Sequence, residues 1–189
     1  MNFLAHAYLS QHSVPLMVGN FIADFIKGNQ INLYHNEIIE GIVMHRKIDE
    51  FTDRHKVFKR SRKRIWKKYR HYSNVIIDLY YDHFLASNWM DYSSIPLNDF
   101  ASHVYSVMQE HEDILPERAR EMLPYMIRYN WLANYSSIEG IDRSLKGLSR
   151  RTPYNSRMEE ARQDLIDHYR DLEKDFREFF PEITAFFSL

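Results

Sequence analysis

The chain has 189 residues, 44% of them hydrophobic, which suits one domain with one hydrophobic core. It has no cysteine, and this excludes disulfide bonds, thiolate metal ligands and a cysteine nucleophile. Its formal net charge is only −1. No Asn-Gly or Asp-Gly pair joins alternating apolar runs, so the hairpin signature of a β protein is missing and helices are expected.

The composition also argues against a membrane protein. No segment reaches the roughly 18 uncharged apolar residues that a spanning helix needs. The first residues lack the positively charged stretch of a secretory signal. Because the chain also has no cysteine, we expect a cytoplasmic protein without a membrane partner.

Apolar residues recur at spacings of three and four along nearly the whole chain, which is typical of amphipathic α-helices. We therefore expect an all-α protein, a single-domain helical bundle over residues 1–189. The spacing predicts helices at residues 2–11, 14–27, 34–52, 55–70, 74–89, 97–113, 117–134, 137–149 and 156–187.

In the first two predicted helices, polar residues lie within the apolar stripes rather than opposite them. His6 follows Phe3 by three residues, and Asp24 shares a helix face with Met17 and Phe21. Residues on the apolar face of a helix point toward the core. We therefore expect the Asp24 carboxylate to point inward.

The third and fifth predicted helices repeat this pattern. Ile42, His45 and Asp49 follow one another on a single face, and His45 and Asp49 are four residues apart, so both side chains can approach one ion. His83 continues the apolar stripe of the fifth helix, with Asp82 at its margin. These four helices each offer at least one potential metal ligand.

A buried carboxylate without a counter-charge is costly, so a group of inward-facing aspartates needs a cation. Imidazole and carboxylate ligands suit Mn²⁺, Fe²⁺, Zn²⁺ or Mg²⁺. The candidates are sufficient for one ion with supporting groups or for two ions. The predicted metal ligands are His6, Asp24, His45, Asp49, Asp82 and His83.

Each candidate also has a purely structural interpretation. A single histidine on an apolar face, such as His6, is often a hydrogen-bonded core residue. Asp49 has Arg46 and Arg54 as possible ion-pair partners, and Asp82 is close enough to the stripe margin to be a surface residue. Taken together, the pattern favours a metal site.

The segment 54–70 is strongly basic, with ten lysines and arginines and no acidic residue. Like charges four residues apart repel one another in a helix, so such a segment indicates an anionic macromolecular partner rather than a merely solvated face. Trp66 and Tyr69 are expected on its core side, although they could stack bases if the partner were RNA. The predicted partner-binding residues are Lys59, Arg60, Arg62, Lys63, Arg64, Lys67 and Lys68.

Several short motifs resemble those of the acyl carrier protein phosphodiesterase family. They occur in the family's order and at similar separations, and the likeness extends over nearly the whole chain. Individually they are short, but together they are specific. The motifs are MNFLAH at 1–6, GNFIADFIKG at 19–28, HRKID at 45–49, DHFL at 82–85 and SRR at 149–151.

The resemblance implies a distorted HD-type helical phosphohydrolase fold and a divalent metal, usually Mn²⁺ or Mg²⁺. It implies hydrolysis of the phosphodiester that joins 4′-phosphopantetheine to the serine of holo acyl carrier protein. It also implies metal ligation by the six candidate residues named above. Acyl carrier proteins are small and strongly acidic, so the basic segment would attract one electrostatically. On this reading no nucleic acid partner is expected.

Five residues receive a role in catalysis or phosphate binding. Asp24 is the metal ligand that the motifs support most strongly, and we expect it to be catalytic. Lys27 and Arg46 lie within about one helical turn of proposed ligands, and we expect them to contact the non-bridging phosphate oxygens. Arg150 and Arg151 are further candidates for phosphate binding.

Two other functions remain open from the sequence. The first is an HD-like phosphohydrolase that acts on a nucleotide or another small phosphoester. The second is a non-catalytic RNA-binding helical module whose functional surface is the basic segment. Bound divalent metal would argue against the second, and dependence on the basic residues would argue against the first.

Overall fold

The structure of the chain, a computed structural model, describes residues 2–187 and contains no β-strand in this range, so the all-α prediction is confirmed. The α-helices are α1 (Phe3–Leu9), α2 (Val14–Ile22), α3 (Asn36–Arg54), α4 (Lys56–Tyr69), α5 (Ser73–Ser87), α6 (Leu97–Glu110), α7 (Glu117–Arg128), α8 (Trp131–Asn134), α9 (Ile138–Arg151), α10 (Ala161–Asp167) and α11 (Tyr169–Phe187). The 3-10 helices are η1 (Ala23–Phe25), η2 (Gly28–Leu33), η3 (Arg70–Tyr72), η4 (Trp89–Asp91), η5 (Glu112–Ile114) and η6 (Met158–Glu160).

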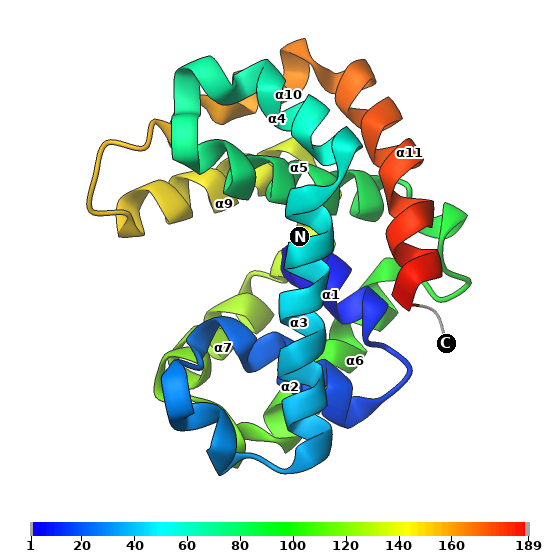
Figure 1. Ribbon diagram of the computed structural model, residues 1–189, viewed down its shortest axis with the longest axis vertical. Helices are drawn as coiled ribbons and strands as arrows, with labels where there is room; N and C mark the ends of the chain where they lie inside the picture. The colour runs from blue at the N-terminus through cyan, green and yellow to red at the C-terminus, as the bar shows by residue number, and fades with distance from the viewer. Residues whose placement is uncertain (1, 188–189) are drawn as a thin grey trace.

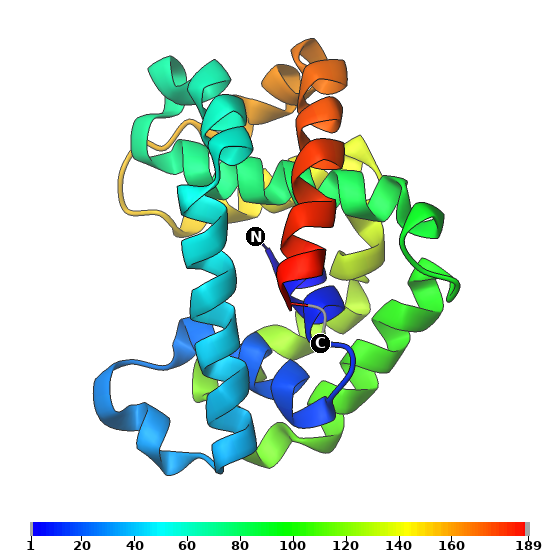
Figure 2. The same ribbon diagram turned by 45° about the vertical axis from the view of Figure 1, so that its right-hand side comes forward.

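The long helix α3 connects two groups of helices (Figure 1). One group contains α1, α2, α6 and α7, and the other contains α4, α5, α9, α10 and α11. In the turned view, α11 lies in front of α5 and the end of α11 approaches α1 (Figure 2). Within residues 2–187, no helix combines the length and the apolar character needed to cross a membrane.

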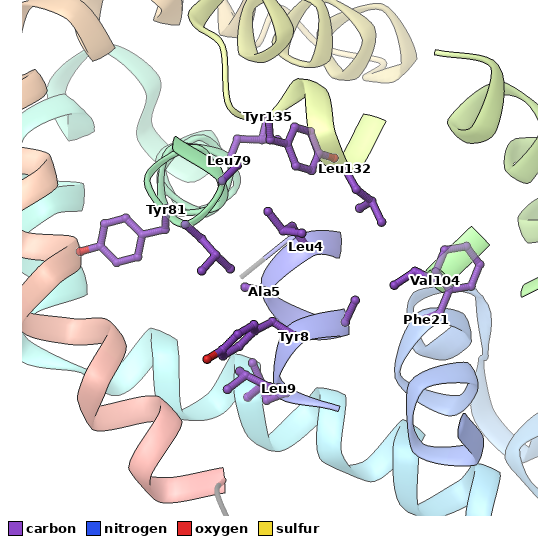
Figure 3. Packing of buried hydrophobic residues seen from close by; sticks show 14 of the residues in the cluster. Leu4, Ala5, Tyr8, Leu9, Phe21, Leu79, Tyr81, Val104, Leu132 and Tyr135 are labelled. Atoms are coloured by element: carbon purple, nitrogen blue, oxygen red, sulfur yellow. The ribbon is translucent and has the colours of Figure 1, made fainter. Parts of the chain in front are cut away.

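Helix α1 lies in the middle of the hydrophobic core. Its residues from Leu4 to Leu9 are all buried. Figure 3 shows Leu4 close to Leu79 of α5, to Leu132 of α8 and to Tyr135, the residue that follows α8. A helix enclosed in this way has little freedom to move, so the position of any polar side chain it carries is fixed by the packing around it.

Two glycines allow α2 and α3 to approach closely. A Cβ atom at Gly19 would overlap the carbonyl oxygen of Ile38, and one at Gly41 would overlap the carbonyl oxygen of Leu16. Both obstacles are backbone atoms, which cannot rotate away as a side chain can. The missing side chains therefore bring Asn20, the neighbour of Gly19, directly against α3.

Replacing Gly41 by alanine is expected to lower the free energy of unfolding by about 3 kcal/mol, because the new methyl group forces α2 and α3 apart. Chemical denaturation of the wild-type and Gly41→Ala proteins measures this change. Gly147→Ala is the matched control, because it is also a helical glycine and a Cβ there meets no atom within 4 Å. Equal free energies of unfolding for the two variants would show that α2 and α3 can accommodate a methyl group where they cross.

Two of the longest predicted helices are interrupted in the structure. The range 117–134 is divided into α7 and α8 at Asn130, which has a left-handed φ of 39°. The range 156–187 is divided into η6, α10 and α11. The apolar spacing continues across both interruptions, so it predicted the buried faces but not the breaks between the helices.

Candidate active site

Two histidines and an aspartate meet where α1 crosses α3. The rings of His6 and His45 are stacked, with centroids 4.0 Å apart and planes inclined by 16°. One carboxylate oxygen of Asp49 lies 3.2 Å from His6 Nε2, and the other lies 3.2 Å from His45 Nε2. The Asp49 carboxylate therefore bridges the two imidazoles.

Asp24 joins this cluster from a different element than expected. The predicted helix 14–27 ends at Ile22, and Asp24 lies on the 3-10 helix η1, after which Ile26 has an extended backbone. Its Oδ1 is 3.2 Å from His45 Nε2, and its side chain is 66% exposed. The expected inward-pointing position is therefore wrong: Asp24 contacts the cluster from the solvent side.

Asn20 orients both imidazoles, although the sequence analysis did not select it. Its Oδ1 lies 2.8 Å from His6 Nδ1 and 3.0 Å from His45 Nδ1, and its Nδ2 donates to the His6 carbonyl. With Nδ1–H of each ring donating to Asn20, both Nε2 atoms face the carboxylates. The signal was available, because Asn20 is a polar residue in the otherwise apolar sequence of α2.

The charges in the cluster are unevenly distributed. Burial lowers the pKa of His6 to about 4. Burial also acts to lower the pKa of His45, but Asp24 and Asp49 outweigh it and raise this pKa to about 9. Burial acts to raise the pKa of Asp49, but hydrogen bonds with His45 and His6 hold it well below its usual range. The hydrogen bond with His45 likewise lowers the pKa of Asp24. Two carboxylates therefore stay ionised around a neutral His6.

The geometry of the cluster fits a divalent metal. One ligand atom from each of His6, His45 and Asp49 lies within 4.8 Å of the others. Two imidazole nitrogens and a carboxylate oxygen form a donor set that suits first-row divalent ions. Histidine ligands are commonly fixed by a hydrogen bond from the other ring nitrogen, which is the role Asn20 plays here.

Asp82 does not lie in this cluster. Its carboxylate is fully buried and accepts the backbone N–H groups of Leu4 at 2.8 Å and of Asn2 and Ala5 at 3.3 Å. Burial raises its pKa to about 7, against the opposing effect of these N–H donors. Asp82 therefore satisfies the free N–H groups at the start of α1, and we withdraw it from the proposed ligands.

His83 does not lie in the cluster either. Its Nδ1 is 2.8 Å from the carbonyl oxygen of Tyr135, and its Nε2 is 3.0 Å from the hydroxyl of Tyr169. Its Nε2 thus faces a tyrosine hydroxyl, whereas Nε2 of His6 and of His45 faces a carboxylate of the cluster. Its inward position was correctly predicted, but it points to a different part of the core, and we withdraw it as well.

A cleft of about 580 Å³ opens beside the cluster. Asp24, His45 and Asp49 line one part of it, while Arg118 of α7 and Arg151 of α9 line another. The structure therefore places the predicted Arg151 at the site and adds Arg118, which no motif had indicated. Anionic and cationic groups face the same opening, which suits a phosphate bound next to a metal.

The other three predicted phosphate-binding residues are placed differently. The described residues that line the cleft do not include Lys27, Arg46 or Arg150. Successive residues of a helix point about 100° apart, so Arg46 is turned into solvent when His45 points inward. Arg150 lines an adjoining pocket together with Arg151 rather than the cleft itself, and Lys27 is exposed beyond η1.

Part of the basic segment has partners within the chain. Arg60 Nε donates to the buried Asp175 at 2.7 Å, and Arg64 contacts the other oxygen of the same carboxylate. Lys68 Nζ lies 2.8 Å from Asp164. These three residues attach α4 to α10 and α11, which corrects their assignment to partner binding.

The remaining cations face solvent. Lys59, Lys63 and Lys67 are exposed and four residues apart, so they form one row along α4, which we call the basic stripe. Arg62 lies beside this row and contacts Asn74 at 3.1 Å. Tyr69 is buried, as the sequence predicted.

Comparison with known proteins gives one consistent family. Residues 1–183 match the family model described as acyl carrier protein phosphodiesterase. A protein of that name from Photorhabdus laumondii is 35% identical over 184 residues, which cover 96% of this chain and 92% of the relative. Another from Yersinia enterocolitica is 34% identical over 188 residues, which cover 98% and 96% of the two chains.

A third relative with this name, from Klebsiella pneumoniae, is 35% identical over 187 residues, which cover 97% of this chain and 95% of the relative. No solved structure matches the chain, so the HD-type arrangement stays a prediction. The shared name describes a phosphoric diester hydrolase, and the matches extend over nearly the full length. The chain therefore belongs to the acyl carrier protein phosphodiesterase family.

Proposed function

We propose that this protein is a divalent-metal-dependent phosphodiesterase that removes 4′-phosphopantetheine from the serine of holo acyl carrier protein and leaves the apo form. The main support is the cluster of His6, His45 and Asp49, whose ligand atoms converge beside a cleft with arginines in its wall. Family membership supports the choice of carrier protein as the substrate.

The proposed metal ligands are His6, His45 and Asp49, with Asp24 next to them at the mouth of the site. A divalent ion such as Mn²⁺ or Mg²⁺ would supply positive charge to the phosphodiester and acidify an attacking water molecule. Asn20 holds both imidazole rings with their Nε2 atoms toward the site. The protein thus keeps its ligands in position before any ion arrives.

Arg118 and Arg151 are the proposed contacts for the non-bridging phosphate oxygens. A guanidinium group presents paired N–H donors that match two oxygens of a phosphate. The carboxylates of Asp24 and Asp49 would repel the same phosphate if they faced it alone. The arginines and the cation therefore have complementary roles, since both offset negative charge as the substrate binds.

The basic stripe is the proposed docking surface for the acidic carrier protein. Reversing its charge with Lys59→Glu, Lys63→Glu and Lys67→Glu should lower kcat/KM for holo carrier protein at least about tenfold at low ionic strength, because steering by opposite charge is lost. Steady-state kinetics at several salt concentrations measure this effect. The same three positions changed to arginine keep the charge and should retain wild-type activity.

Turnover of a small diester, bis(p-nitrophenyl) phosphate, provides a second comparison for the glutamate variant. The carrier-protein function predicts that this turnover is unchanged, because the small substrate needs no docking surface. If holo carrier protein were hydrolysed equally well by the variant and the wild type, with no dependence on salt, a small phosphoester would be the better candidate for the natural substrate.

Mass spectrometry tests the proposed reaction itself. Incubation of holo carrier protein with the enzyme and Mn²⁺ should reduce the mass of the carrier protein to that of the apo form, and free 4′-phosphopantetheine should appear. A carrier protein of unchanged mass, in an assay where the enzyme hydrolyses a nucleotide or another small phosphoester, would contradict the proposal.

A further inference from the structure

A second pocket, lined by residues of α8 and α9, adjoins the cleft. Its volume is about 360 Å³, and the two spaces share the lining residues Asn2, Phe3, Leu148 and Arg151. The shared residues place the pocket directly beside the cleft. Because Arg151 lines both spaces, a phosphate bound at Arg151 lies at the border of the pocket.

The walls of this pocket are mainly apolar, with neutral polar and basic side chains among them. Trp131, Tyr135 and Leu148 supply apolar surface, and Asn134 and Ser144 place an amide and a hydroxyl group in the wall. The lining also includes the exposed basic residues Arg143, Lys146 and Arg150. Pockets for small organic ligands combine mainly apolar walls with a few polar groups, and they have volumes of about 300–1,000 Å³. This pocket has both properties.

We propose that this pocket binds the pantetheine arm of the substrate, an inference that rests on the proposed function. The arm leaves the phosphate on the side opposite the serine ester, so it must extend inward when the carrier protein stays outside the cleft. It is uncharged and contains methyl groups and two amides, which match the aromatic walls and the side chains of Asn134 and Ser144. Arg151 lines both spaces, so in this arrangement it lies next to the bond between the phosphate and the arm.

Gly147 allows the pocket to be filled without disturbing the fold. It lies within α9 and lines the pocket, and a Cβ atom placed on it meets no other atom within 4 Å. Tryptophan at this position would occupy the space proposed for the arm. Alanine would fill only a small part of that space and improve the helix propensity of α9, so it gives the smaller step of a size series.

The test compares kcat/KM for holo carrier protein in the wild type, Gly147→Ala and Gly147→Trp. The inference predicts a small decrease for Gly147→Ala and a decrease of about 100-fold for Gly147→Trp, because the larger side chain prevents the arm and the phosphate from being positioned together. Turnover of bis(p-nitrophenyl) phosphate, which has no arm, should be the same in all three. Equal activity of Gly147→Trp and Gly147→Ala on holo carrier protein would overturn the pocket while leaving the proposed function intact.

Fluorescence of Trp131 gives a readout that is independent of turnover. Titration of the wild type with 4′-phosphopantetheine should change the emission, and a Trp131→Phe variant should lose most of that change although Trp66 and Trp89 remain. If Gly147→Trp loses activity on both substrates, this titration decides the question. An emission that stays constant at concentrations of 4′-phosphopantetheine that inhibit hydrolysis would overturn the inference. A wild type inactive on holo carrier protein would instead refute the proposed function.

Discussion

Replacing Asp49 by alanine is expected to lower kcat for holo carrier protein by about 1,000-fold or more, a loss typical of removing a principal charge from a catalytic site. Asp49 contacts Nε2 of both His6 and His45, so its removal takes away the group that joins the two imidazoles. Its side chain is 44% exposed, and the change therefore leaves no buried cavity. Stopped assays on the purified variant measure the loss.

The control for this variant is Glu50→Ala on the same helix. Glu50 is exposed, forms an ion pair with Arg54, and lines a groove on the other face of α3. Its removal should leave kcat unchanged. Circular dichroism should show the same helix content for both variants. An Asp49→Ala protein with wild-type kcat would show that catalysis does not depend on this cluster.

The second large effect is expected at Asn20, a positioning residue. Asn20→Leu keeps a similar volume but removes the side-chain acceptor of both Nδ1–H groups, so His6 loses its partner and His45 keeps only the backbone carbonyl of residue 20 at 2.9 Å. Loss of such a supporting hydrogen bond usually costs about 10- to 100-fold in metal affinity or activity. We expect Mn²⁺ affinity, measured by titration, to decrease by this factor together with kcat.

Asn20→Asp separates positioning from simple loss of stability. A carboxylate keeps the acceptor for both rings, loses the Nδ2 donor to the His6 carbonyl and adds one negative charge. Metal affinity should therefore recover in Asn20→Asp relative to Asn20→Leu. If both variants bound Mn²⁺ as tightly as the wild type while unfolding at a lower temperature, Asn20 would have only a structural role.

Helical periodicity was sufficient to predict the part of the site that lies on regular helices. His45 and Asp49 are one turn apart on α3, an uninterrupted helix, and periodicity fixes their relative direction. His6 lies on α1, whose apolar stripe also continues to its end. For these residues, the apolar face of the helix is also the face that lies against the site.

Periodicity states which side chains point inward but not which neighbour they meet. His83 is buried as predicted, yet it meets Tyr135 and Tyr169 rather than the other histidines. Asp82 is also buried, and it caps α1. The direction of a side chain in the core depends on how α5 packs against other helices, and local sequence does not contain that information.

Contacts between distant segments explain the remaining differences. The ion pairs of Arg60 and Arg64 with Asp175 join residues more than 100 positions apart. Arg118 reaches the cleft only because α7 is placed opposite α3 in the folded chain. No spacing rule for a single helix predicts such contacts, whereas the basic stripe is predictable because its three lysines follow the period of α4.

The most direct test of the account is the binding of a divalent ion by the cluster. Electron paramagnetic resonance of Mn²⁺ titrated into the wild type should show bound ion, and a variant carrying both His6→Ala and His45→Ala should show none at the same concentrations. Treatment of the wild type with a chelator should remove the ion and the hydrolysis of holo carrier protein together, and both should return when Mn²⁺ is added. Undiminished hydrolysis by the chelator-treated, metal-free protein would contradict the account.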